Sequence, residues 1–435
     1  MTPRIGSLFS GIGGLDLAVE SFLGGETVWH CEVDPEPSRV LAARWPGVPN
    51  LGDITTVDWA TVPPVDVLCG GFPCQDLSLA GRRKGMRPGT RSGLWADFVT
   101  AIRALKPSVV IIENVRGLLS GCAESDSDVE PCPGCVADGG GVPHAPRIRA
   151  LGRVLGDLDA LGFDAEWHGL RASDVGAPHG RFRVFMLAYA RGIRLDERWD
   201  AASRQAAGGR ASTVTGGRGR APVTLLPTPT TQPETGNGRA RNLGKEIVLL
   251  PTPSAAEFDG DPEVFMERAA RMKKLGINGN GAGMPLAIAV QTLLPTPVTT
   301  DAKGARNSTA QRTKRGAHSG VTLTDALVTT PRADDAQGNV TGTVSWGEYE
   351  PAVRRWESIT RTAPAPTRPD GKGGRHRLSP LLSEWMMGYP DGWVTDILGR
   401  DASIRACGNG VVPHQAFTAL TILWARVLEW IEAAA

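Results

Sequence analysis

The sequence predicts an α/β fold, a doubly wound and mostly parallel sheet of the Rossmann-related kind, joined to a separate and irregular domain. Three observations predict it. Short apolar runs alternate with helical patterns from residue 1 to about 190. Between 191 and 375 the composition shifts to Gly, Thr, Pro, Arg and Ala with weak periodicity, and dense apolar content returns after 376. We therefore expect a first domain over 1–190, a loop-rich domain over 191–375, and a segment over 376–435 that returns to the first domain.

The first domain presents its elements in a regular order. Strands are predicted for the apolar runs RIGSLF, ETVWHCEV, VDVLCGGF, SVVIIENV and RVFMLAYA, and helices for LDLAVESFL, SRVLAARW, LWADFVTAIRAL and LGRVLGDLDALG. A polar insertion rich in Gly and Pro interrupts this order at about 120–147. After the loop-rich stretch, ALTILWARVLEWIEAA predicts a C-terminal helix that must bury its apolar face.

Composition limits the class of protein. Hydrophobic residues make up 41% and charged residues 21%, which is typical of a globular chain, and no apolar run approaches the roughly 18 residues that span a bilayer. We expect no membrane association, and with no leader pattern at MTPRIGSLFSG we expect a cytoplasmic protein. The net charge of +1 does not by itself favour a polyanionic partner, but basic clusters occur around 82–91, 181–183 and 306–315.

A glycine-rich turn follows the first predicted strand and begins a helix. Gly11, Gly13 and Gly14 would let backbone approach a ligand at the helix N-terminus, and Glu32 ends the next strand, where a carboxylate suits a ribose diol. The pattern predicts a nucleotide-like cofactor. An adenosyl group, NAD and FAD would all fit it, and tight packing alone would also explain such a turn.

Seven cysteines, an odd number, point to free thiols, a metal site or a nucleophile. The segment DVLCGGFPCQDLS places Pro73 and Cys74 in a loop beyond a strand, at the carboxyl edge of a parallel sheet where ligands of such folds bind. The strand VVIIENV brings Glu113 to the same edge. A thiolate beside a carboxylate suits addition to carbon 6 of a pyrimidine, with the carboxyl group on ring nitrogen 3. A buried inert thiol is the alternative for Cys74.

The ordered set of motifs resembles the DNA cytosine-5 methyltransferases. FSGIGG resembles the family's cofactor loop, GGFPCQDLS its nucleophile loop, ENV its carboxylate segment and RFR its paired arginines, while MMGYPDGW and GNGVVP resemble its C-terminal segments. The resemblance spans 4–190 and 376–420. It implies a class I methyltransferase-like sheet, S-adenosylmethionine as cofactor, double-stranded DNA as partner, and a target cytosine flipped out of the duplex.

The resemblance also implies roles for individual residues. The catalytic set is Cys74, Glu113, Arg183 and Arg181, and the cofactor-binding set is Phe9, Gly11, Gly13, Gly14, Glu32, Asp53, Pro73 and Asn409. The length of 191–375 matches that of a target-recognition domain. A monomer, with a separate cognate restriction endonuclease, is the arrangement the resemblance suggests.

The chain departs from the family's pattern at three positions. The family often has an acidic residue where this chain has Ser7, a Gln at His179 and a Ser at Gly410. None of these departures removes a catalytic group, so they concern cofactor and backbone contacts rather than the reaction.

Three other functions remain open at this stage. A tRNA cytosine-5 methyltransferase would share the cysteine, the carboxylate and the cofactor loop. A catalytically silent nucleic-acid-binding module is a second alternative. A dinucleotide-dependent oxidoreductase would explain the glycine loop but leaves PCQ, ENV and RFR without a role.

The insertion at 120–147 lies outside the family's common pattern. It carries four potential ligands of tetrahedral zinc, namely Cys122, Cys132, Cys135 and His144. So short and Gly-rich a segment has too little apolar content to fold alone, and a structural metal would stabilise it. Free thiols in a plain loop are the alternative.

Overall fold

The computed structural model describes residues 2–73, 94–120, 122–124, 147–193, 199–208, 212–215, 222–225, 344, 346–370 and 377–434, and the single residues 267, 271 and 286. Its centre is a six-stranded sheet of order β2-β1-β3-β4-β8-β7. The strands are β1 (Arg4–Leu8), β2 (Glu26–Cys31), β3 (Val67–Gly70), β4 (Val109–Val115), β7 (Phe163–Arg171) and β8 (Phe182–Ala190). The first four run parallel, whereas β8 is antiparallel to both β4 and β7. The predicted α/β fold with a mostly parallel sheet is confirmed.

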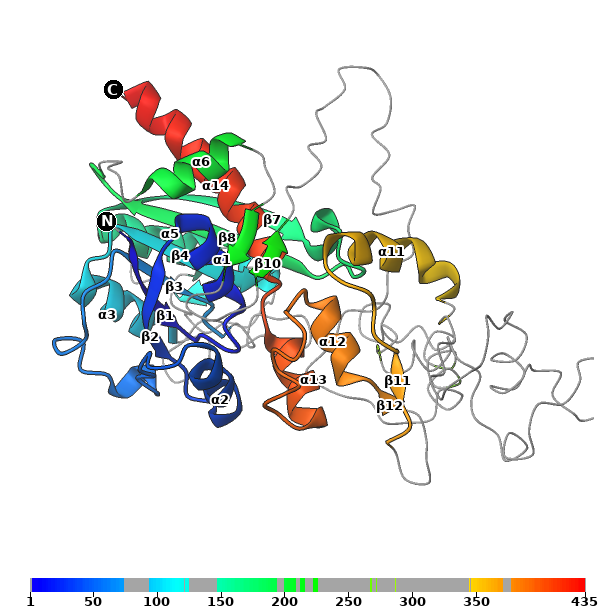
Figure 1. The fold of residues 1–435 in the computed structure, drawn as a ribbon. Coiled ribbons are helices and arrows are strands. Elements are labelled where there is room, and N and C mark those ends of the chain that lie inside the picture. The colour runs from blue at the N-terminus through cyan, green and yellow to red at the C-terminus, as the bar shows by residue number, and fades with distance from the viewer. Residues whose placement is uncertain are drawn as a thin grey trace, which may run out of the picture.

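Helices cover both faces of this sheet. On one face lie α1 (Gly14–Leu23), α6 (Asp200–Gly208) and α14 (Pro413–Ala434), and on the other α3 (Trp95–Leu105) and α5 (Ala150–Ala160) (Figure 1). Strand β4 shows why both faces are covered: Val109 and Ile111 belong to the first core, Val110 and Ile112 to the second, and all four are fully buried. Successive side chains of a strand point to opposite faces, so an uninterrupted apolar run requires cover on both.

The topology contains a switch point beside β1. The chain passes from β1 through α1 to β2 on one side, and then through α2 (Pro35–Arg44) to β3 on the other side of β1. Loops leaving neighbouring parallel strands in opposite directions leave a crevice at the carboxyl edge of the sheet. The local sequence sets these connections: Gly24 ends α1 at φ 64°, and Asp34 begins α2 by accepting the Glu36 N–H at 3.0 Å.

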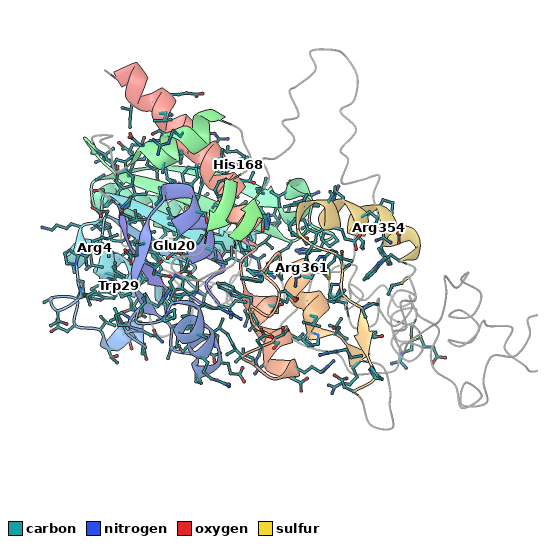
Figure 2. All side chains as sticks on the ribbon, in the orientation of Figure 1. Arg4, Glu20, Trp29, His168, Arg354 and Arg361 are labelled. Atoms are coloured by element: carbon teal, nitrogen blue, oxygen red, sulfur yellow. The ribbon has the colours of Figure 1, made fainter. Side chains whose placement is uncertain are left out.

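A C-terminal group of elements lies beside the sheet. It consists of α11 (Glu350–Ile359), β11 (Thr367–Arg368), β12 (Arg377–Leu378), α12 (Pro380–Met386) and α13 (Arg400–Asn409) (Figure 1). Arg361 lies beside α12 (Figure 2). It donates to the Tyr389 carbonyl at 2.9 Å. From α13 the chain returns to the sheet as α14, whose Phe417 and Trp424 pack on Phe22 of α1 at ring distances of 5.7 and 6.1 Å.

Short elements complete the described residues: α4 (Gly117–Ser120), the pair β5 (Cys122–Glu124) and β6 (Arg147–Arg149), the pair β9 (Ser212–Thr215) and β10 (Pro222–Leu225), and 3-10 helices at Ile54–Thr56, Ala172–Val175 and Gly347–Tyr349. Most of 191–375 lies outside the described residues, so the expected recognition domain there stays a prediction. The stretch Arg400–Ile431 is long and apolar enough to cross a membrane, because it contains an 18-residue window with a mean hydropathy of 1.2. However, 67% of that window is buried inside the protein.

Candidate active site

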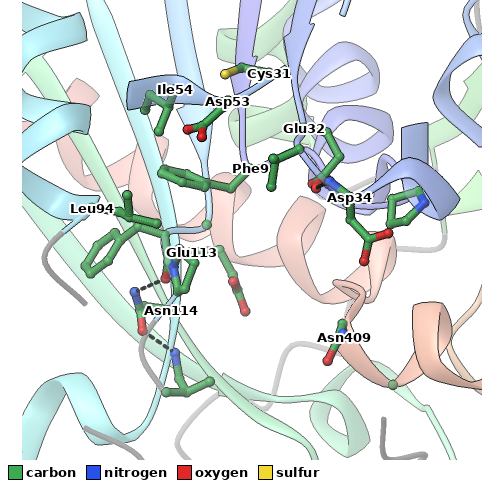
Figure 3. A pocket seen from close by; sticks show the side chains of 18 of the residues that line it. Phe9, Cys31, Glu32, Asp34, Asp53, Ile54, Leu94, Glu113, Asn114 and Asn409 are labelled. Carbon is green, nitrogen blue, oxygen red and sulfur yellow. Dashed lines mark hydrogen bonds between the residues drawn. The ribbon is translucent and has the colours of Figure 1, made fainter. Parts of the chain in front are cut away.

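A cavity of about 370 Å³ opens at the carboxyl edge of the parallel strands (Figure 3). The carboxyl ends of β1, β2, β3 and β4, the start of β8 and the end of α13 all contribute to its lining. The predicted residues that line it are Phe9 and Gly11 after β1, Glu32 after β2, Asp53, Pro73 after β3, Glu113 of β4, Arg181, Arg183 and Asn409. Nine of the predicted site residues, far apart in sequence, therefore surround one opening, because parallel strands end at the same edge of a sheet.

The glycine loop has two different uses for its glycines. Gly11 has φ +54°, and a β-carbon there would meet nothing within 4 Å, so its backbone faces open space at the cavity. A β-carbon on Gly13 would lie 2.4 Å from the Trp45 ring, and one on Gly14 would lie 2.3 Å from the Tyr389 hydroxyl. Gly13 and Gly14 thus permit close packing, and only Gly11 presents bare backbone to the larger cavity.

Glu32 is held at the cavity by backbone donors. Its carboxylate accepts the N–H of Gly11 at 2.8 Å and the N–H of Asp34 at 2.8 Å. Burial raises the pKa of Glu32, and these backbone hydrogen bonds partly offset the rise. Asp53, across the cavity, uses Oδ1 to accept from the Thr55 N–H at 3.0 Å and the Thr55 hydroxyl at 2.9 Å. Backbone and hydroxyl donors thus hold two acidic side chains at the cavity, where both can act as hydrogen-bond acceptors.

Glu113 and Arg183 form a partly buried ion pair. Arg183 Nε lies 2.7 Å from Glu113 Oε1, with side chains 14% and 11% exposed. The antiparallel pairing of β8 with β4 brings both side chains to the cavity. A β-carbon on Gly71 would lie 2.9 Å from Glu113 Oε2, so the glycine keeps the carboxylate clear of the loop after β3. The pair presents a carboxyl group and a fixed cation side by side to any bound base.

The loop expected to carry the nucleophile is attached to β4. Asn114 donates from Nδ2 to the Phe72 carbonyl at 3.1 Å and accepts the Val115 N–H at 2.8 Å (Figure 3). This anchors the loop one residue before Pro73, which lines the cavity. Cys74 follows directly and lies outside the described residues.

Arg181 lines the cavity and binds backbone carbonyl groups. Its guanidinium donates to the carbonyls of Gly408 at 2.9 Å and Gly410 at 2.8 Å, on either side of Asn409. Burial lowers the pKa of Arg181 to about 9, and the neighbouring Arg183 adds to this effect. These contacts give Arg181 the task of holding the turn that presents Asn409 to the cavity.

The thiols of the described cysteines are poor nucleophiles. Cys31, Cys69 and Cys407 are free and buried. Burial raises the pKa of Cys31 to about 12, and it raises those of Cys69 and Cys407 well above the ordinary thiol value. A thiol of this kind holds almost no thiolate near neutral pH.

The cavity also contains residues that the sequence patterns did not single out. Val33 is 68% exposed on its rim, and Ile54 and Leu94 line its wall. Val33 follows Glu32 at the end of β2, so its place was readable from the strand end. Leu94 begins the predicted helix LWADFVTAIRAL, and only the fold brings it to the cavity.

The expected zinc ligands fall almost entirely outside the described residues. Cys132, Cys135 and His144 lie outside the described residues. Of Cys122 only the backbone is described, as the first residue of β5. Within the residues that the structure does describe, no group of three potential metal ligands occurs.

Known proteins resemble the N-terminal part of the chain. The family described as C-5 cytosine-specific DNA methylase matches residues 4–208. The Type II methyltransferase M.NlaIV of Neisseria lactamica is 32% identical over 41% of this chain and 39% of its own length. The Type II methyltransferase M.HhaI of Haemophilus parahaemolyticus is 32% identical over 44% of this chain and 50% of its own length. The matched segment thus covers half of these relatives or less. Residues 4–208 form a domain of the C-5 cytosine-specific DNA methylase family.

Proposed function

We propose that the chain is a DNA cytosine-5 methyltransferase that uses S-adenosylmethionine and acts through Cys74. The observation that carries the proposal is one cavity lined by the Glu113–Arg183 pair, the end of the loop before Cys74, and the carboxylates of Glu32 and Asp53. The dinucleotide alternative leaves the first two features without a role.

The cavity suits an adenosyl cofactor. Open space beside Gly11 lets a ligand approach the backbone, and the exposed apolar side chain of Val33 offers a surface for a base. The two carboxylates can accept hydrogen bonds from hydroxyl and amino groups of the ligand. We assign Glu32 to the ribose and Asp53 to the adenine, with Phe9, Pro73 and Asn409 around the methionine portion. When bound, S-adenosylmethionine supplies an electrophilic methyl group on its sulfonium.

The chain's own residues then act on a flipped cytosine. The Cys74 thiolate adds to carbon 6 while the carboxyl group of Glu113 holds ring nitrogen 3, and the ring electrons make carbon 5 nucleophilic. After carbon 5 gains its methyl group, a base or water removes the carbon 5 proton. The bond between Cys74 Sγ and ring carbon 6 then breaks, which restores the 5,6 double bond of the ring and the free thiolate of Cys74. Arg183, beside Glu113, contacts the exocyclic oxygen and stabilises negative charge on the ring.

A covalent trap tests this chemistry. Duplex DNA of mixed sequence containing 5-fluorocytosine should form an adduct that survives a denaturing gel, because fluorine at carbon 5 blocks the final elimination. The adduct should require S-adenosylmethionine and disappear in Cys74→Ser. If no adduct forms, the proposal that the protein methylates cytosine is wrong. An adduct with tRNA but not with duplex DNA would instead support the tRNA cytosine-5 methyltransferase.

We further propose that 191–375 selects the DNA sequence. Turn-rich segments held by a rigid scaffold commonly carry specificity. Replacing this segment by that of a relative should change the methylated sequence, as measured by bisulfite sequencing, while cofactor binding persists. An active chimera with an unchanged target sequence would refute the assignment.

The remaining expectations stay predictions: a cytoplasmic monomer with no membrane partner, a separate restriction endonuclease, and a zinc site at Cys122, Cys132, Cys135 and His144. Metal analysis of protein purified without chelators tests the last. About one zinc per chain, lost in both Cys132→Ser and Cys135→Ser, would support it.

A further inference from the structure

A second and smaller cavity, of about 60 Å³, lies under the glycine-rich loop. It adjoins the larger cavity, because five residues line both: Phe9, Gly11, Gly71, Glu113 and Asn409. Its remaining walls come from the end of β1, the first turn of α1 and the turn after α13. A ligand in the larger cavity could therefore extend a small group into the smaller one.

Asp16 lines this small cavity and is 0% exposed. Neither of its carboxylate oxygens has a hydrogen-bond partner among the described residues. His30 Nδ1 lies 3.2 Å from Oδ1 but does not complete a hydrogen bond, and it leaves Oδ2 free. A buried carboxylate without donors is costly, so this position calls for a group that donates hydrogen bonds or carries positive charge.

The other acidic residue on the cavity wall already has such a partner. Glu113 is paired with Arg183, with 2.7 Å between the charged atoms. Ser7, where the family often has an acid, also lines the cavity, and its hydroxyl donates to Ser10 Oγ at 2.8 Å. The strand position thus carries no charge in this chain, and the free carboxylate comes instead from the first turn of α1.

We propose that Asp16 binds the α-ammonium group of S-adenosylmethionine. The inference rests on the proposed function. The first N–H groups of a helix have no acceptor within it, so the N-terminus of α1, ten residues long, suits the cofactor's α-carboxylate beside Asp16. The cofactor's α-ammonium group then meets the Asp16 carboxylate, and its α-carboxylate meets the positive end of the helix dipole, within one turn of α1.

A comparison of two ligands isolates this contact. S-adenosylhomocysteine carries the amino-acid portion, whereas 5′-methylthioadenosine lacks it, and calorimetry gives both dissociation constants with the full-length protein. Asp16→Asn should weaken S-adenosylhomocysteine by roughly 10- to 100-fold, the range for a hydrogen bond to a charged group. The same substitution should change the affinity for 5′-methylthioadenosine less than about twofold, within the spread expected when no contact is lost.

Glu20→Gln is the matched control. Glu20 lies one turn further along α1, is also buried, and already accepts from the Thr27 N–H at 3.0 Å and from Trp45 Nε1 at 2.8 Å. Its substitution should lower thermal stability without changing the ratio of the two affinities. Asp16→Ser, smaller and still polar, repeats the measurement if the Asn variant does not fold.

Each outcome decides. Selective loss of S-adenosylhomocysteine binding supports the ammonium site. Equal loss of both ligands makes Asp16 a structural residue, and no loss of either makes the cavity a site for water alone, so both overturn the inference. If the wild-type protein binds neither ligand, the proposed function itself fails.

Discussion

Glu113 is the residue on which the proposed chemistry most depends, because its ion pair with Arg183 and its place over Gly71 leave it little freedom. Glu113→Gln keeps the shape of the side chain but removes its acid and its charge. We expect methyl transfer to duplex DNA to slow by at least ~10²-fold, within the usual range for a general acid. Single-turnover transfer of a tritiated methyl group measures the rate.

Glu26→Gln, at the exposed start of β2, serves as the control for that substitution and should leave the rate unchanged. A near-normal rate in Glu113→Gln would show instead that the carboxylate only positions Arg183.

His179 links stability to pH at a single residue. It is fully buried, and burial lowers its pKa to about 3, with a further contribution from Arg181. Its Nε2–H donates to the Met386 carbonyl at 3.1 Å, which requires no ring charge. The unfolded chain takes up a proton at this ring below about pH 6.5 and the folded one does not, so stability falls as pH drops from there towards 3.

His179→Gln, the residue common in the family, should remove this dependence. Between pH 7 and 5 its free energy of unfolding should fall by about 2 kcal/mol less than that of the wild type. Urea unfolding at the two pH values measures the difference. Parallel pH profiles for the two proteins would mean that the ring is protonated in the folded state as well.

The turn between α12 and α13 is an element organised by one carboxylate. Glu384, fully buried, accepts the N–H of Gly392 at 2.9 Å and that of Val394 at 2.7 Å. Between them Trp393 donates from Nε1 to the Ile12 carbonyl at 2.9 Å. A buried acceptor on α12 therefore shapes a loop that in turn supports the glycine loop of the cofactor cavity.

Glu384→Ala leaves those buried N–H groups without acceptors. We expect it to cost about 3–5 kcal/mol of unfolding free energy, the range for breaking a buried charged network. Asp391→Ala in the same turn removes a side chain that is 78% exposed and should cost less than about 1 kcal/mol. Equal losses in urea unfolding would show that Glu384 does not organise the turn.

At the scale of the whole molecule, the two ends of the chain share one core. Trp424 of α14 is 1% exposed and packs on Phe22 of α1 and on Trp199, the latter at 5.6 Å between ring centres. The first and last helices, α1 and α14, thus cover the same face of the sheet. The whole segment 191–375 lies between these two helices in sequence.

Two tryptophans of α14 test this arrangement. Trp424→Ala should lower the unfolding free energy by about 3–5 kcal/mol, as a large cavity in a core does. Trp430→Ala, 63% exposed on the same helix, should change it by less than about 0.5 kcal/mol. A small loss at Trp424 would mean that α14 packs only weakly on α1.

The sequence by itself determined the fold class and nine of the residues that line the cavity. Uninterrupted apolar runs such as VVIIENV need cover on both faces, and their strand ends meet at one edge, so Glu32, Pro73 and Glu113 could be placed together. Strand β7 escaped prediction because, at the sheet edge, only two of its nine residues are buried and its apolar pattern is weak.

Only the tertiary structure decided which of several equivalent residues meets which partner. Sequence spacing treats Gly11, Gly13 and Gly14 alike, whereas the packing of Trp45 and Tyr389 leaves open space beside Gly11 alone. Sequence spacing also could not show that Arg181 binds the turn around Asn409, more than two hundred residues away. Nor could it show that the Asp16 carboxylate is buried without a hydrogen-bond donor among the described residues. Periodicity encodes which face of an element is buried, but contacts between distant segments arise only when the elements pack.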